Sequence, residues 1–84
     1  MKASIEISMY PLVPEYEQPI LQFIERLHQY SELTIQTNTM STQIFGDYDQ
    51  MMMIVNKEMK QSFIENKATV MVMKVIGMDL NPSN

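Results

Sequence analysis

The chain has 84 residues, no Cys, no Trp and a formal net charge of −4 at pH 7. Without Cys it has no disulfide framework and no thiolate nucleophile, and its six scattered Lys and Arg residues lack the clustering that nucleic-acid binding requires. No apolar run approaches the roughly 20 residues that span a bilayer, and the start, MKASIEISMY, alternates instead of forming a secretory signal. We therefore expect one cytoplasmic domain over residues 1–84, without nucleic-acid or membrane partners.

The first predicted elements are a strand and a helix. Residues 3–10, ASIEISMY, alternate apolar and polar side chains, as a strand with one buried face does. Pro11 and Pro14 end this strand, and Pro19 suits the first turn of a helix. An apolar stripe then predicts about four helical turns. Its members are Ile20, Phe23, Ile24, Leu27 and Tyr30.

Two strands joined by a tight turn are predicted next. Residues 32–39, ELTIQTNT, are rich in β-branched side chains, which strands favour. Residues 41–46, STQIFG, form the third strand, so the connection lies near Thr39 and Met40. Polar turn residues such as those in NTMST commonly bond their own backbone, and that is the interpretation from the residues alone.

A second helix is predicted from about Tyr48 to Ile64. Asp47 is placed to accept hydrogen bonds from the backbone of its first turn. Asn66 is expected to end the helix in the left-handed conformation, a role that Gly fills more often. The predicted buried stripe consists of Met52, Val55, Met59 and Phe63.

The last predicted strand, 67–78, carries apolar side chains on both of its faces. Such a strand is expected to be covered on both sides over part of its length, which suggests a partner subunit. The polar residues after it, DLNPSN, are expected to form a loop or to fray.

The order β-α-β-β-α-β predicts an α+β, ferredoxin-like sandwich, in which a four-stranded antiparallel sheet carries two helices on one face. We expect the first and third strands to be parallel neighbours in the centre. This would place Tyr10 and Pro11 at the same end as Gly46 and Asp47, with residues 38–42 at the other end. Function is then sought on the free sheet face and at the strand ends.

Three segments resemble the thiamine-binding, YkoF-like family of small ferredoxin-like proteins. They are EISMYPL, TNTMSTQIFGDYDQMM and ATVMVMKV, in the same order and at the same spacing over nearly the whole chain. The resemblance implies binding of thiamine or hydroxymethyl-pyrimidine by a homo-dimer or tetramer. We expect a non-enzymatic role without a cofactor or metal. The resemblance assigns ligand binding to Ser8, Tyr10, Asn38, Met40, Ser41, Thr42, Gly46 and Asp47. The chain departs from the family at ENKA, where Gly is usual, and in lacking an Arg after the last strand.

An aminopyrimidine is a flat ring with an amine donor and ring-nitrogen acceptors, so its site needs an apolar slot and a few fixed polar groups. Tyr10, Met40 and Tyr48 could form the slot. Ser8, Asn38, Ser41, Thr42 and Asp47 could supply hydrogen bonds. In the expected topology the turn and the Gly46–Asp47 step lie about 17 Å apart. Either the ligand uses one end, or a partner chain completes the site.

Other polar and sulfur-containing residues have simpler interpretations. The ten Met residues are interpreted as core and interface fillers rather than metal ligands, and His28 as a surface residue. Glu6 lies on the free sheet face, where it could meet a cationic ligand or pair with Lys74 across the strands. We favour the pair.

Two other functions compete with ligand binding. A structural or regulatory module would use the sheet only for self-association. An enzyme of acylphosphatase type would need an Arg near the first loop, and PLVPEYEQP has none.

Overall fold

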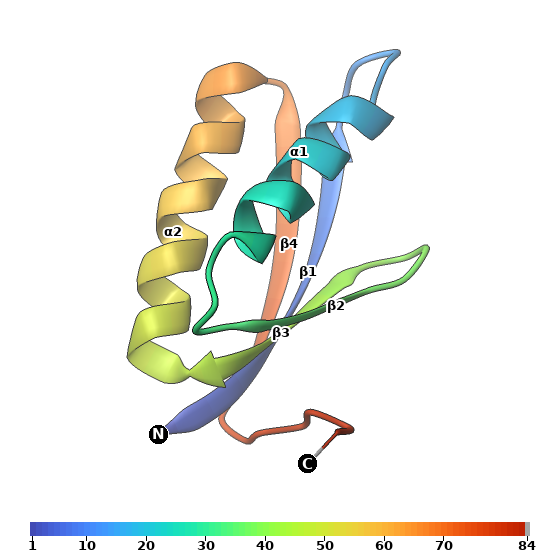
Figure 1. Cartoon of the computed structure of the whole chain (residues 1–84). Coiled ribbons are helices and arrows are strands. Elements are labelled where there is room, and N and C mark those ends of the chain that lie inside the picture. The colour runs from blue at the N-terminus through green and yellow to red at the C-terminus, as the bar shows by residue number, and fades with distance from the viewer. Residues whose placement is uncertain (84) are drawn as a thin grey trace.

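The computed structural model describes residues 1–83 (Figure 1). The sheet has the order β2-β3-β1-β4, and every neighbouring pair is antiparallel. Both helices cover the same face of this sheet (Figure 1). The elements are β1 (Lys2–Pro11), α1 (Glu17–His28), β2 (Thr34–Thr37), β3 (Thr42–Asp47), α2 (Tyr48–Glu65) and β4 (Thr69–Ile76). The predicted ferredoxin-like α+β fold is confirmed.

The direction of the two central strands corrects the predicted topology. β1 and β3 are antiparallel, with Ile7 opposite Thr42, and not parallel as expected. A β-α-β crossover leaves room for one strand between β1 and β2, and β3 enters this gap after the chain has reversed at the hairpin. The hairpin turn therefore lies beside the end of β1, near Tyr10, while Gly46 and Asp47 lie beside its start.

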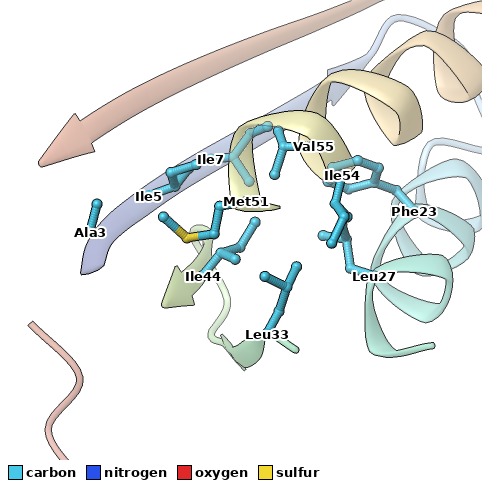
Figure 2. Packing of buried hydrophobic residues seen from close by; sticks show 10 residues of the cluster. All are labelled: Ala3, Ile5, Ile7, Phe23, Leu27, Leu33, Ile44, Met51, Ile54 and Val55. Atoms are coloured by element: carbon cyan, nitrogen blue, oxygen red, sulfur yellow. The ribbon is translucent and has the colours of Figure 1, made fainter. Parts of the chain in front are cut away.

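The hydrophobic core fills the space between the sheet and the two helices (Figure 2). The odd-numbered residues of β1 face this layer, in agreement with the predicted alternation. Fully burying one large apolar side chain contributes about 1.5–3 kcal/mol. The core residues are Ala3, Ile5, Ile7, Phe23, Leu27, Leu33, Ile44, Met51, Ile54 and Val55. The α1 stripe is confirmed at Phe23 and Leu27, and its other predicted members are half-buried.

The buried face of α2 differs from the predicted stripe. Its buried residues are Met51, Ile54, Val55, Glu58 and Ser62, so only Val55 was predicted correctly. Met52 and Met59 are half-buried, and Phe63 is exposed. The prediction followed apolar residues alone, whereas two inward positions of this helix carry polar side chains.

Arg26 of α1 makes these two inward polar positions possible. Its Nε donates to Glu58 Oε1 at 2.7 Å and its Nη2 donates to Ser62 Oγ at 2.6 Å. The Tyr30 hydroxyl donates to Glu58 Oε2 at 2.6 Å, so both carboxylate oxygens have partners. Burial acts to raise the pKa of Glu58, but the hydrogen bonds from Tyr30 and Arg26 and the Arg26 charge outweigh it and hold the pKa below its usual value.

The predicted N-terminal cap of α2 is confirmed, and the predicted conformation at its C-terminal end is wrong. Asp47 caps the helix as predicted, since its carboxylate accepts the Gln50 N–H at 3.2 Å. This bond is the main cause that lowers the pKa of Asp47. Asn66 is not left-handed, because its φ of −140° and ψ of 92° are extended. Its carbonyl instead accepts the Thr69 hydroxyl at 2.7 Å, which joins the helix end to β4.

The sheet face away from the helices, here called the open face, carries the even-numbered residues of β1. Residues 77–83 after β4, here called the C-terminal tail, form a loop, as expected for DLNPSN, whose last residue, Asn84, lies outside the described residues. This tail is anchored. The Ser4 hydroxyl donates to the Met78 carbonyl at 2.7 Å and accepts the Leu80 N–H at 2.8 Å. Within residues 1–83 no helix is long and apolar enough to cross a membrane.

Candidate functional site

A cavity of about 170 Å³ opens between the turn of the β2–β3 hairpin, the end of β1 and α1. We call it the hairpin cavity. One wall comes from β1 and α1 and is apolar except for Tyr10, and the other comes from the turn and is polar except for Met40. The lining residues are Ile7, Met9, Tyr10, Ile20, Phe23, Ile24, Asn38, Thr39, Met40, Ser41 and Thr42. This combination of an apolar wall and a few polar groups is typical of small-molecule sites.

The antiparallel centre of the sheet decides which predicted site residues meet. Five of them line the hairpin cavity: Tyr10, Asn38, Met40, Ser41 and Thr42. Ser8 adjoins them, because its hydroxyl donates to the Met40 carbonyl at 3.3 Å. Gly46 and Asp47 lie at the opposite end of β3, and Tyr48 follows them there. The slot that we expected from Tyr10, Met40 and Tyr48 is therefore not formed within one chain.

The hairpin turn is held by Asn38. Its Oδ1 accepts the N–H groups of Met40 at 2.8 Å and Ser41 at 2.9 Å, and its own N–H donates to the Ser41 carbonyl at 3.0 Å. As expected, the polar residues of the turn bond their own backbone, and the Asn38 side-chain amide makes these bonds. Among residues 1–83 the Asn38 Nδ2 has no hydrogen-bond partner, so this NH₂ group can donate to a ligand.

Replacing Asn38 with Ala is expected to lower the free energy of unfolding by about 1–2 kcal/mol, because two hydrogen bonds that close the turn are lost. Denaturant unfolding measures the change. Thr39→Ala is the matched control at the next residue of the turn, and it should leave stability nearly unchanged. Equal effects of the two substitutions would contradict the role given to Asn38.

Glu6 lies beside the cavity, on the open face. The Ser41 hydroxyl donates to its Oε2 at 3.1 Å, and Lys74 Nζ lies 3.4 Å from its Oε1. These two groups, Ser41 first, lower the pKa of Glu6, so its carboxylate is charged at neutral pH. The pair that we favoured between Glu6 and Lys74 is confirmed. Because the Ser41 proton is already engaged, its oxygen is available to a ligand as an acceptor.

The apolar wall contains residues that the sequence analysis assigned only to the core. Ile20, Phe23 and Ile24 lie at positions i, i+3 and i+4 of α1, and Met9 faces them from β1. Ile20 and Ile24 are only half-buried because β2 has four residues and leaves this end of the helix uncovered. In the sequence, the mostly polar stretch between Ile35 and Ile44 indicated that the second strand is short. A short strand leaves part of the apolar stripe of α1 uncovered by the sheet.

The described residues contain no group of three or more His, Cys, Asp and Glu side chains that could hold a metal ion. His28 is exposed at the end of α1, in agreement with its predicted surface position. The lowered pKa of Glu6 arises from the hairpin and from a strand neighbour, Ser41 and Lys74.

No protein-family model matches the chain, and no curated protein matches it. Several solved structures match the chain over most of its length. A Streptococcus pneumoniae protein is 24% identical over 95% of this chain and 90% of its own, with a TM-score of 0.86. A Thermotoga maritima protein proposed to act in thiamine biosynthesis or salvage is 15% identical over 99% and 92%, with a TM-score of 0.86. A hypothetical protein from Methanocaldococcus jannascii is 21% identical over 99% and 87%, with a TM-score of 0.80. At these identities the chain shares the fold of all three.

Proposed function

We propose that this chain is a non-enzymatic binding protein for thiamine or a related hydroxymethyl-pyrimidine, akin to the YkoF-like proteins, and that it acts as a homo-oligomer. The observation that carries the proposal is the hairpin cavity, in which five of the eight residues suggested by the resemblance line one space. A solved structure of the same fold, named for thiamine biosynthesis or salvage, supports the ligand class.

The chemistry of the lining suits an aminopyrimidine ring. Tyr10 and Met40 offer flat and polarisable surfaces for its faces. The Asn38 NH₂ group can donate to a ring nitrogen, and the Ser41 oxygen can accept from the exocyclic amine. One ring nitrogen and the exocyclic amine thus each have a complementary partner in the turn.

The volume of the cavity favours a site that a second copy completes. Sites for drug-sized ligands occupy roughly 300–1,000 Å³, whereas the hairpin cavity holds about 170 Å³. At roughly 30 Å³ for each water this corresponds to about six water molecules, which is enough for a single six-membered ring but not for thiamine as a whole. Tyr10 and Met40 are exposed at its mouth, where another chain could cover the rest of the ligand.

Calorimetric titration with hydroxymethyl-pyrimidine and with thiamine tests the proposal. A ligand at 100 times its dissociation constant should add about 2.7 kcal/mol to stability. Ser41→Ala removes the acceptor that the proposal gives to the exocyclic amine and should weaken binding about tenfold. Tyr48→Phe removes a hydroxyl at the other end of the sheet and should leave affinity unchanged. Absence of binding at millimolar ligand would contradict the proposal.

A structural or regulatory self-association module is the second candidate. It is favoured by β4, an edge strand of eight residues on which Val70 and Val72 are about half exposed. Edge strands with bare apolar side chains are prone to pair with other chains. Light scattering that shows an oligomer, together with silent titrations of both ligands, would support this candidate over the first.

A further inference from the structure

A second cavity, of about 200 Å³, lies on the open face, on the opposite side of the sheet from the hairpin cavity. We call it the tail cavity, because the C-terminal tail forms one of its walls. The residues that matter for its chemistry are Ser4, Glu6, Gln43, Phe45, Ile76 and Leu80. It shares no lining residue with the proposed pyrimidine site, and the two are linked by the Ser41 hydroxyl, which donates to Glu6.

The strand register arranges the floor of the tail cavity in two rows. Gln43, Glu6 and Lys74 are direct neighbours across β3, β1 and β4 and form a polar row. Phe45, Ser4 and Ile76 form the adjacent row, which is apolar apart from the central Ser. Rows two residues apart along a strand are separated by about 6.6 Å. A ligand with a polar head and a short apolar body would match both.

The C-terminal tail covers the apolar row of Phe45, Ser4 and Ile76 on its solvent side. The Ser4 hydroxyl holds the Met78 carbonyl and the Leu80 N–H, which brings the Leu80 side chain into the wall of the cavity. Phe45 shares the open face with Ser4 and is nevertheless only 5% exposed. The apolar end is therefore sheltered, although no helix covers this side of the sheet (Figure 1).

The charge at the polar row indicates the kind of head group. Glu6 lines the cavity; the Lys74 side chain, which is 73% exposed, places its ammonium 3.4 Å from Glu6 Oε1, and the Ser41 hydroxyl donates to Glu6 Oε2 at 3.1 Å. Exposed ion pairs of this kind contribute little to stability, so Lys74 can turn into solvent when another cation arrives. The Gln43 side chain beside Glu6 adds a neutral acceptor.

We propose that the tail cavity binds a small primary alkylammonium ion. Its ammonium group donates to the Glu6 carboxylate and the Gln43 amide oxygen, and its carbon chain lies over Phe45 and Ile76 beneath Leu80. At roughly 30 Å³ for each water, the volume corresponds to about seven water molecules, which suits a chain of about five carbons. The proposal does not depend on pyrimidine binding.

Titration of the ¹⁵N-labelled full chain with n-pentylammonium, followed by amide chemical shifts, tests this site. We expect saturable shifts at Ser4, Glu6 and Leu80, with a smaller one at Ser41, whose hydroxyl donates to Glu6, and none at Tyr10 or Asn38, whereas hydroxymethyl-pyrimidine should shift Tyr10 and Asn38 instead. 1-Pentanol and pentanoate should bind at least about tenfold more weakly, because they lack the charge-assisted bond to Glu6. Equal binding of pentanol and pentylammonium would overturn the proposal.

Four variants separate the contributions of the side chains. Glu6→Gln should weaken pentylammonium binding about tenfold, and Leu80→Ala should weaken it severalfold while keeping the backbone anchor to Ser4. Lys74→Gln should strengthen binding, since it removes the competing cation. Ile64→Ala, at an exposed position of α2, should change nothing. An unchanged affinity in Glu6→Gln, or a weaker one in Lys74→Gln, would show that the head group is not recognised as proposed.

Discussion

Replacing Arg26 with Met is expected to lower the free energy of unfolding by about 3 kcal/mol, because it leaves the Glu58 carboxylate buried without its counter-charge. Loss of one partner of a buried pair costs about 3–5 kcal/mol, and the lower end applies because the Arg26 side chain is 24% exposed. A domain of this length has only about 4–13 kcal/mol in total. Denaturant unfolding should show an earlier midpoint with little change in slope.

The control for this substitution is Lys60→Met on the exposed side of α2, which should change stability by less than about 0.5 kcal/mol. The double variant Arg26→Met with Glu58→Leu should be more stable than Arg26→Met alone, since no unpaired charge remains. If the double variant were less stable than Arg26→Met, the loss of stability in Arg26→Met would come from lost packing and not from the unpaired Glu58 carboxylate.

The pH dependence provides a second readout of the same pair. The folded-state pKa of Glu58 is below its usual value. Its stabilisation is therefore present above the unfolded pKa and is lost as the pH falls through the folded one. The wild-type chain should lose stability as the pH falls below about 5 into the acid range, and Glu58→Gln should lose less over the same range.

Replacing Phe23 with Ala is expected to lower the free energy of unfolding by about 3–5 kcal/mol, because Phe23 is only 1% exposed and its ring fills space between α1 and the sheet (Figure 2). The same ring lines the hairpin cavity, so its loss also enlarges the proposed pyrimidine site. Thermal and denaturant unfolding measure the first effect. For binding, Phe23→Leu is the better variant, because it should keep the chain folded at ligand-titration temperatures.

Leu21→Ala is the matched control, since Leu21 lies on the solvent side of α1 and is 55% exposed. It should change stability by less than about 0.5 kcal/mol. The Arg26 guanidinium lies 6.0 Å from the centre of the Phe23 ring, so Phe23→Ala and Arg26→Met should not be additive. A Phe23→Ala chain as stable as Leu21→Ala would contradict the assignment of Phe23 to the core.

The order of the elements could be predicted from the sequence because each element has its own periodicity. The alternation in β1 and the stripe in α1 identify the buried residues Ile5, Ile7, Phe23 and Leu27 directly. The antiparallel orientation of β1 and β3 was mispredicted because the relative orientation of two strands depends on the whole topology. The orientation follows only when β3 is placed in the gap between β1 and β2.

The composition of the candidate site depended on that direction. With antiparallel centre strands, Thr42 meets Ile7 and the hairpin reaches Tyr10, so one chain gathers most of the predicted residues. With parallel strands the hairpin would have met the start of β1. The apolar wall from α1 was signalled only indirectly, by the polar stretch between Ile35 and Ile44, because the α1 stripe itself does not show where β2 ends in space.

The buried polar face of α2 shows a second limit of sequence patterns. Glu58 and Ser62 lie inward only because Arg26 reaches them from another helix, and no spacing within α2 signals this. The conformation of Asn66 was mispredicted for a similar reason. A local preference for a left-handed residue gave way to the contact that its carbonyl makes with Thr69.

The central position of β1 has a consequence for the kinetics of folding. The first strand of the chain, β1, lies between β3 and β4. Its two hydrogen-bonding partners therefore follow about 40 and 70 residues later in the sequence. Contacts of such long range slow folding compared with helical bundles of similar length. During synthesis β1 can pair with β3 first, but its other edge stays unpaired until β4 has left the ribosome, and chaperones have that interval in which to engage it.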